Sequence, residues 1–363
     1  MNNNDLYMQR CLELAKLGAG AVAPNPMVGS VLVYEDKIIG EGYHQLYGQA
    51  HAEVNCIRDA EIRYNAAEHP GNNSFEKILQ KSTIYVSLEP CAHFGKTPPC
   101  ADLIIQKKIP HVVIGCRDPF KQVDGKGIEK LLAAGVTVQS GVLEAACKEL
   151  NKRFFIFHTQ HRPYIILKWA QSADLKIAAN NTSRVYITNE FTNRIVHKWR
   201  SEEASILVAT NTAIIDNPSL TNRLWSGNNP IRMVLDMNLR LPDSLHLFDG
   251  AVKTIIFNAH RQDAKEGLVY YKLKSNLPLA QQICDALYQL HIQSVLVEGG
   301  TLLLQAFMEE ELWDEARVIT NNDLIIGEGV AAPVLTKVNP EISSQIFTDI
   351  IRVYKRTVDS SLV

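Results

Sequence analysis

Short apolar segments alternate with helical ones along most of this chain, and this alternation constrains the fold more than any other feature. In the first half, segments typical of strands lie at 28–36, 82–90 and 111–118. Segments with helical spacing separate them at 51–60 and 100–108. Strands that alternate with helices form layered sheets with crossover connections. The sequence therefore predicts an α/β fold.

A second series of the same kind begins at Pro163, and the 363 residues suffice for two domains. We expect the boundary within 148–163, which gives domains 1–147 and 148–363. The second series comprises predicted strands at 164–172, 204–210, 231–236, 253–258 and 294–300, and predicted helices at 189–203, 280–290 and 301–312.

The composition, 46% hydrophobic and 21% charged, is typical of globular proteins. A net charge of −2 provides no overall basic field to attract nucleic acid. No apolar run approaches the roughly 18 to 20 residues that span a bilayer, and the N-terminus lacks an apolar signal stretch. Seven cysteines, an odd number, are thinly spread and indicate reduced thiols. We therefore expect a cytoplasmic protein without nucleic-acid or membrane partners.

Four residues stand out as a candidate metal centre. His51 and Glu53 begin a predicted helix, Cys91 follows a predicted strand, and Cys100 opens the next helix. One imidazole and two thiolates are good zinc ligands, and three protein ligands leave a position for water, as in catalytic sites. Zinc lowers the pKa of that water to roughly 7. Glu53 is positioned to move its proton as general base and then general acid.

A purely structural interpretation treats these residues as a buried histidine and two small apolar cysteines. Their joint pattern favours chemistry, because His-x-Glu followed by Pro-Cys is the signature of zinc deaminases. That signature closes with Cys-x-x-Cys, whereas here the loop AHFGKTPP separates Cys91 from Cys100.

The long ligand loop, together with APNPMVGSVLV upstream, resembles the bifunctional riboflavin-biosynthesis deaminase/reductase family. The resemblance covers nearly the whole chain. It implies a cytidine-deaminase-like three-layer α/β/α domain, followed by a dihydrofolate-reductase-like α/β domain. It also implies a phosphoribosylamino-pyrimidine substrate, zinc and NADPH as cofactors, and a homo-oligomer.

The resemblance assigns roles to particular residues. In the first domain His51, Cys91 and Cys100 would bind zinc, Glu53 would shuttle protons, and Asn25 would contact the substrate. His93 and Lys96 in the ligand loop could also reach the substrate. In the second domain, the residues implied to bind the cofactor are Gln171, Tyr186, Thr212, Asp216, Gly299, Gly300 and Thr301, and those implied to bind the substrate are Arg184, Arg200, Leu220, Arg223 and Glu298.

General chemistry supports part of this second set. Gly299 and Gly300 permit close backbone approach at a strand-to-helix turn, where a helix N-terminus can receive phosphate. The two arginines Arg200 and Arg223 suit a phosphate through paired hydrogen bonds.

The chain departs from the family at two places in the second domain. Leu175 stands where a glycine is usual, and Arg184 stands where a small residue is usual. These departures keep open a deaminase with a degenerate reductase domain. A zinc deaminase acting on RNA and a zinc-stabilised scaffold without activity are also compatible with the metal-ligand pattern.

Overall fold

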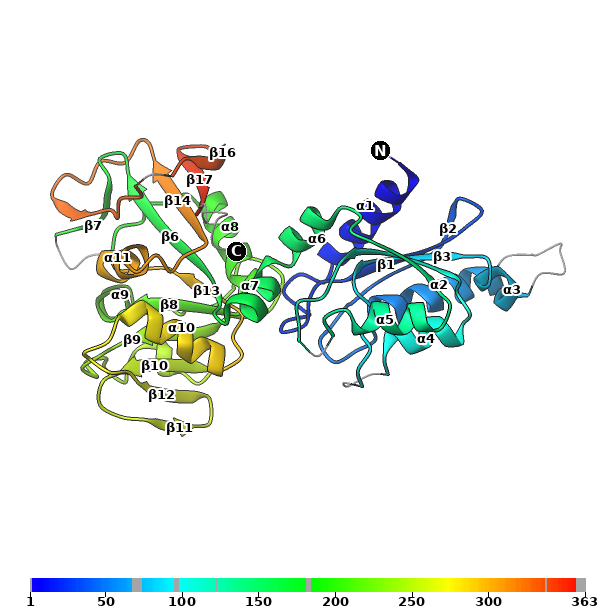
Figure 1. Cartoon of the computed structure of the whole chain (residues 1–363). Coiled ribbons are helices and arrows are strands. Elements are labelled where there is room, and N and C mark those ends of the chain that lie inside the picture. The colour runs from blue at the N-terminus through cyan, green and yellow to red at the C-terminus, as the bar shows by residue number, and fades with distance from the viewer. Residues whose placement is uncertain are drawn as a thin grey trace. The chain divides into compact units, whose positions relative to one another are not determined.

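The computed structural model of the chain describes residues 2–66, 74–94, 98–121, 123–180, 184–336 and 338–356. Lys96 lies outside these residues. The chain forms two compact units, Met1–His161 and Arg162–Val363 (Figure 1).

A five-stranded sheet in the order β2-β1-β3-β4-β5 lies at the centre of the described part of unit 1. The first three strands pair antiparallel, and β3, β4 and β5 pair parallel. The elements of this unit are α1 Asn3–Lys16, β1 Gly29–Tyr34, β2 Lys37–Tyr43, α2 Ala52–Ala66, α3 Phe75–Leu79, β3 Thr83–Leu88, α4 Cys100–Gln106, β4 His111–Cys116, α5 Lys126–Ala133, β5 Thr137–Ser140, α6 Glu144–Leu150 and α7 Lys152–Gln160.

Helices cover both faces of this sheet, because alternate strand residues point to opposite sides. Leu32 of β1 packs into a core with α2, α3, α4 and α5. Val31 and Val33, its neighbours, pack into a second core with α1 and α6. This arrangement confirms the expected three-layer α/β/α domain.

Unit 2 contains a sheet of ten described strands in the order β11-β12-β10-β9-β8-β13-β6-β14-β17-β16, and a small pair β15-β7. The strands from β12 to β14 run parallel, and the remaining pairs are antiparallel. The elements of this unit are β6 Tyr164–Ser172, β7 Lys176–Ala179, α8 Glu190–Glu202, β8 Ser205–Ala209, α9 Thr210–Asp216, β9 Ile231–Leu235, the 3-10 helix His246–Phe248, β10 Thr254–Asn258, β11 Asp263–Lys265, β12 Leu268–Lys272, α10 Leu279–Gln289, β13 Ser294–Val297, α11 Thr301–Glu309, β14 Glu315–Asn321, β15 Gly329–Ala331, β16 Pro340–Ile346 and β17 Asp349–Lys355.

Both faces of the parallel part are also buried. Leu207 of β8 packs with α10 and α11, whereas Ile206 and Val208 pack against α9 and the 3-10 helix. The sheet therefore presents the carboxyl ends of β6, β13, β8 and β9 side by side, which is where sites form in open α/β sheets.

The division between the units falls after α7, between His161 and Arg162, which lies inside the boundary region 148–163 expected from the sequence. Asn151 holds this segment in unit 1 through two hydrogen bonds. Its Oδ1 accepts from the Met27 N–H at 2.8 Å, and its amide donates to the Met27 carbonyl at 2.8 Å. Phe155 of α7 also packs against the core beneath α1 and α6. The local spacing of apolar residues could not show that residues 148–161 would pack into the core of unit 1.

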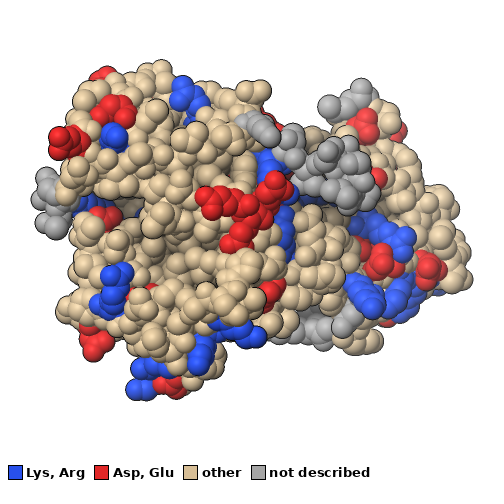
Figure 2. Space-filling model, turned by 60° about the vertical axis from the view of Figure 1, so that its left-hand side comes forward, with Lys and Arg blue, Asp and Glu red and all other residues tan. Residues whose placement is uncertain are grey.

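None of the described helices is both long enough and apolar enough to cross a bilayer. Over the face of the molecule drawn in Figure 2, acidic and basic side chains are interspersed.

Candidate functional sites

Three elements of unit 1 bring His51, Cys91 and Cys100 together. His51 precedes α2, Cys91 follows β3, and Cys100 is the first residue of α4. The His51 Nδ1 atom lies 3.6 Å from the Cys91 Sγ and 3.4 Å from the Cys100 Sγ. The three ligand atoms all lie within 4.8 Å of one another. One nitrogen and two sulfurs at this spacing fit a zinc ion.

The start of α4 favours a thiolate at Cys91. The Cys100 backbone N–H donates to the Cys91 Sγ at 3.3 Å. Hydrogen bonds from the Cys100 thiol and from His51 lower the pKa of Cys91 to about 4. Conversely, the hydrogen bond to Cys91 and burial raise the pKa of Cys100 well above its usual range. The Cys100 N–H and the His51 ring thus favour the thiolate form of Cys91.

Glu53 lies beside these ligands in the first turn of α2 and is 3% exposed. Burial, assisted by the nearby Cys91, raises its pKa to about 7, while His51 opposes the shift. A carboxyl group with this pKa can both release and take up a proton near neutral pH, as a general acid and base must.

Asn25 and His44 form a polar contact near His51. The Asn25 amide lies 3.1 Å from the His44 Nε2, and the His44 Nδ1 lies 3.1 Å from the Ala50 carbonyl. With the ring donating to Ala50 through Nδ1, its Nε2 accepts from Asn25. The His44 and His51 rings meet edge to face, with centroids 5.4 Å apart. Asn25 was predicted from the sequence as a substrate contact, whereas His44, which directly follows β2, was not among the predicted site residues.

Unit 2 contains a pocket of about 890 Å³ at the carboxyl ends of its parallel strands. Most of the residues that the resemblance implied line this pocket. They are Arg184, Tyr186, Arg200, Thr212, Asp216, Leu220, Glu298, Gly299, Gly300 and Thr301.

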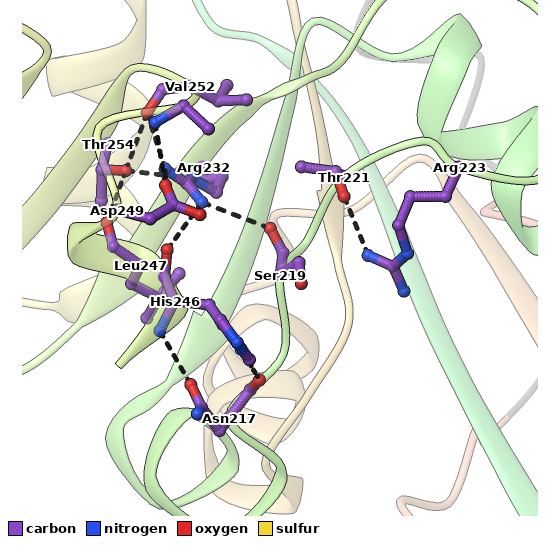
Figure 3. A network of polar contacts seen from close by, with 11 residues as sticks. Asn217, Ser219, Thr221, Arg223, Arg232, His246, Leu247, Asp249, Val252 and Thr254 are labelled. Carbon is purple, nitrogen blue, oxygen red and sulfur yellow. Dashed lines mark hydrogen bonds and ion pairs between the residues drawn. The ribbon is translucent and has the colours of Figure 1, made fainter. Parts of the chain in front are cut away.

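Gln171 and Arg223 are not among the lining residues. The Gln171 amide donates to the Thr320 Oγ1 at 3.1 Å and accepts from the Trp169 indole at 2.8 Å. The Arg223 guanidinium donates to the Thr221 Oγ1 at 2.8 Å (Figure 3). Burial, and the positive charges of Arg200 and Arg184, lower the pKa of Arg223.

Charged side chains meet in the floor of the pocket. Arg200 donates to both oxygens of Glu298, at 3.0 and 2.7 Å, and the Lys168 Nζ lies 3.8 Å from the same carboxylate. Burial opposes ionisation of Glu298, but Arg200 and Lys168 outweigh it and lower the pKa of Glu298 to about 2. Burial lowers the pKa of Lys168. The sequence analysis missed Lys168, and a lysine inside the apolar segment YIILKWAQS was the available signal.

The glycine pair allows the backbone of the β13–α11 turn to approach α9. A side chain at Gly299 would lie 3.1 Å from the Thr212 Oγ1. Gly300 has φ of 75°, in the left-handed region that favours glycine, and a Cβ there would lie 3.0 Å from the Ala209 Cβ. Thr301 begins α11, and the first residues of this helix, whose backbone N–H groups have no partner within the helix, line the pocket.

A buried arginine supports the loop that carries Leu220 into the pocket. Arg232 is fully buried and donates to the Ser219 carbonyl at 3.5 Å and to the His246 carbonyl at 2.9 Å. The His246 N–H in turn donates to the Asn217 Oδ1 at 2.9 Å. Figure 3 shows that this network reaches the segment before Leu220 at two points, Asn217 and Ser219. The network holds Leu220 at φ 49°, a conformation that a leucine seldom adopts.

Comparisons with known proteins agree with this geometry. Residues 1–116 match the cytidine and deoxycytidylate deaminase zinc-binding region, and residues 163–342 match the RibD C-terminal domain. The riboflavin biosynthesis protein RibD of Aquifex aeolicus (strain VF5) is 39% identical over 90% of this chain and 88% of the relative. RibD of Escherichia coli (strain K12) is 33% identical over 86% of each chain.

The chain belongs to the RibD family of riboflavin biosynthesis proteins. The solved structure of Acinetobacter baumannii RibD, form 1, superposes with a TM-score of 0.87 at 30% identity, covering 98% of this chain and 99% of that one. A deaminase/reductase from Thermotoga maritima gives 0.84 at 33% identity, covering 98% and 99%. Both domains of the family are therefore present, and the expected fold of each is confirmed. Zinc and NADPH are the cofactors of these domains.

Two departures from the common RibD sequence have clear structural settings. Leu175 has φ of 59° and is 55% exposed, so it occupies a left-handed position that suits glycine. Arg184 stacks over the Tyr186 ring at 4.8 Å. Burial raises the pKa of Asp216, and Arg184 opposes that shift. Neither departure fills the pocket that a RibD reductase domain requires, because that pocket is open at about 890 Å³.

Proposed function

We propose that this RibD chain first deaminates 2,5-diamino-6-(5-phosphoribosylamino)pyrimidin-4-one and then reduces the ribosyl group of the product to ribityl with NADPH. The observation that carries the proposal is the combination of a His51, Cys91 and Cys100 cluster beside a buried Glu53 with a cation-lined pocket in unit 2.

In the deamination step, His51, Cys91 and Cys100 would hold zinc, which supplies a water molecule with a pKa near 7. Glu53 would take a proton from the attacking water and deliver it to the departing ammonia. Its raised pKa of about 7 supports this role, since both protonation states are then populated at neutral pH. Asn25 would hold the pyrimidine through its amide, which His44 keeps oriented.

In the reduction step the cofactor carries the hydride, so the residues of unit 2 bind and orient the reactants. The turn at Gly299, Gly300 and Thr301 would receive NADPH phosphates at the start of α11. Thr212 and Asp216 would line the same cofactor site, together with Tyr186, whose ring can stack on a flat group.

The substrate would occupy the cationic side of the pocket. Arg184, Arg200 and Leu220 line it, and Arg200 and Arg223 suit the phosphate. Glu298 and Lys168 lie in the same floor, where a carboxylate and an ammonium group can hydrogen-bond to sugar hydroxyls. Gln171 would support the cofactor pocket from outside its lining, through Trp169.

The proposal is tested with purified protein loaded with zinc. We expect ammonia release from the pyrimidine substrate, followed by NADPH oxidation that depends on the deaminated product. Ammonia release without NADPH binding would identify a deaminase with a degenerate reductase domain. A gel-shift with RNA at physiological salt tests for a deaminase that acts on RNA, and we expect no retained complex. Chelation that unfolds the protein without abolishing any activity would instead identify a scaffold.

The cellular setting rests on the same proposal. We propose a cytoplasmic enzyme that acts on a small molecule, without nucleic-acid or membrane partners, and that forms a homo-oligomer. Sedimentation of the purified chain would measure the number of subunits.

A further inference from the structure

Glu89 lies directly after β3 and two residues before the ligand Cys91. Its side chain is 4% exposed, although nothing in the proposed chemistry requires a second carboxylate there. The Glu89 backbone N–H donates to the Cys116 carbonyl at 3.0 Å, so the main chain is held to β4. Its carboxylate turns away from the sheet toward the start of α5, which is far away in sequence.

Four backbone N–H groups donate to this carboxylate. Oε1 accepts from Gly127 at 2.9 Å and from Ile128 at 3.2 Å. Oε2 accepts from Gly125 at 3.0 Å and from Asp118 at 3.3 Å. Only an ionised carboxylate offers acceptors at both oxygens and no donor, so it matches four donors. The N-terminus of α5 also favours a negative charge at this position.

The peptide between Glu89 and Cys91 touches α5 as well. A Cβ built on Gly127 would lie 1.9 Å from the Pro90 carbonyl oxygen, closer than any real contact. Gly127 is therefore the residue that lets the helix approach this peptide. The Glu89 carboxylate and the Gly127 contact fix the segment 89–91 from two sides.

Cys91 is the one ligand of the three whose own segment does not adjoin a helix in sequence, whereas Cys100 lies within α4 and His51 adjoins α2. The Cys91 carbonyl accepts from the Ala101 N–H at 3.1 Å, which holds one side of the segment to α4. The other side is held through Glu89 and the contact at Gly127. Cys91 follows the end of β3 in a non-regular segment and is only half-buried. A ligand on a loose segment would have to be ordered when the ion binds, and that entropy cost would weaken binding.

We propose that Glu89 is a positioning residue for Cys91: by capping α5 it fixes the segment 89–91, and so holds the Cys91 sulfur where zinc binding requires it. The proposal rests on the zinc site of the proposed function. In the Glu-Pro-Cys segment the glutamate therefore holds the backbone in place, and the cysteine binds the ion.

The variant Glu89→Gln tests this with almost no change in size. An amide has only one oxygen, so its NH₂ group must face two N–H donors in either orientation. We expect the zinc dissociation constant, measured by competition with a chromophoric chelator, to rise about 10- to 100-fold, as is typical when groups that support metal ligands are removed. Glu129→Gln is the matched control, because Glu129 is exposed on the same helix, and its zinc affinity should equal that of the wild type.

The visible absorption spectrum of bound cobalt(II) provides a second measurement, which a general loss of stability would not change. In the wild type, bound cobalt should give the visible absorption of a tetrahedral site with thiolate ligands. We expect Glu89→Gln to change the position or intensity of these bands even when the site is saturated, and Glu129→Gln to leave them unchanged. Wild-type zinc affinity together with a wild-type cobalt spectrum in folded Glu89→Gln would overturn the proposal.

NADPH binding by unit 2 serves as an internal check on the integrity of each sample. If unit 1 of the Glu89→Gln variant does not fold, the Gly127→Ala variant provides the test instead. This variant keeps the Glu89 carboxylate but displaces Pro90. A changed cobalt spectrum supports the proposal, and an unchanged one with unchanged zinc affinity refutes it. These measurements compare zinc affinities and need no turnover, so a wild type that binds zinc but releases no ammonia would contradict the proposed function alone.

Discussion

Arg200 and Glu298 form a two-point ion pair in the floor of the unit 2 pocket, with N–O distances of 3.0 and 2.7 Å. The two residues come from α8 and from the end of β13, so the pair links a helix to the strand end that precedes the glycine turn. Lys168 adds a second cation at 3.8 Å. The carboxylate therefore both orients Arg200 and balances part of the positive charge of Arg200 and Lys168.

This pair makes the stability of unit 2 sensitive to acid. The pKa of Glu298 is about 2 in the folded chain, below its ordinary 4.5. The stabilisation is therefore complete above pH 4.5 and is lost as the pH falls through 2. It amounts to about 3 kcal/mol in the free energy of unfolding. Denaturant unfolding between pH 6 and 2.5 should show a shallower acid dependence in Glu298→Gln than in the exposed control Glu309→Gln, and equal slopes in both variants would contradict the assignment.

Replacing Glu53 with glutamine should separate the two activities. The amide cannot carry a proton, so we expect ammonia release to fall about 10²- to 10⁴-fold. Zinc content and reduction of the deaminated product should stay at wild-type levels, because unit 2 is unchanged. Glu61→Gln, an exposed change on the same helix, should retain full activity in both assays. Unimpaired ammonia release by Glu53→Gln would exclude this carboxylate as the proton carrier.

Glycine at position 175 should stabilise unit 2. Leu175 has φ of 59°, which costs an L-residue about 1 to 2 kcal/mol, and only part of the gain is offset by the greater freedom of glycine in the unfolded chain. We expect Leu175→Gly to raise the free energy of unfolding by about 0.5 to 1 kcal/mol, measured by denaturant titration. Leu175→Ala keeps the backbone penalty and should not stabilise, so an equal gain in both variants would point to the lost apolar side chain instead.

Although Arg232 is not a lining residue of the pocket, it should contribute strongly to the free energy of unfolding of unit 2. Replacing it with methionine removes the guanidinium that donates to the carbonyls of Ser219, His246 and Val252, and it leaves the Asp249 carboxylate without its cation. The Asp249 N–H still donates to the His246 carbonyl, and the Thr254 hydroxyl still donates to the Val252 carbonyl. We expect Arg232→Met to lower the free energy of unfolding by about 3 kcal/mol. The Michaelis constant for the pyrimidine should also rise, because the loop carrying Leu220 loses its support.

The milder variant Asp249→Asn provides the comparison for this network. Asp249 is 37% exposed at its side chain, and the carbonyl partners of Arg232 remain in place when it changes. A loss of about 1 kcal/mol or less is expected there. An Arg232→Met variant as stable as Asp249→Asn would show that the carbonyl contacts contribute little.

Local patterns in the sequence were enough to establish the layered α/β fold and the chemistry of the metal centre. Apolar spacing is a local property, so it identified β3, α4 and β4 directly, and residue type alone makes His51, Cys91 and Cys100 zinc ligands. The same local signals were too weak after residue 312, where the sequence analysis predicted no element and the structure has β14, β16 and β17.

Which distant residues act together depended on the tertiary structure. Lys168 meets Glu298 because β6 pairs with β13, and Glu89 meets Gly127 because α5 begins beside the end of β3. Sheet order and helix docking bring these pairs together, and both arise from burial of whole faces rather than from local spacing. For the same reason residues 148–161 joined unit 1, since Asn151 and Phe155 found their partners in its core.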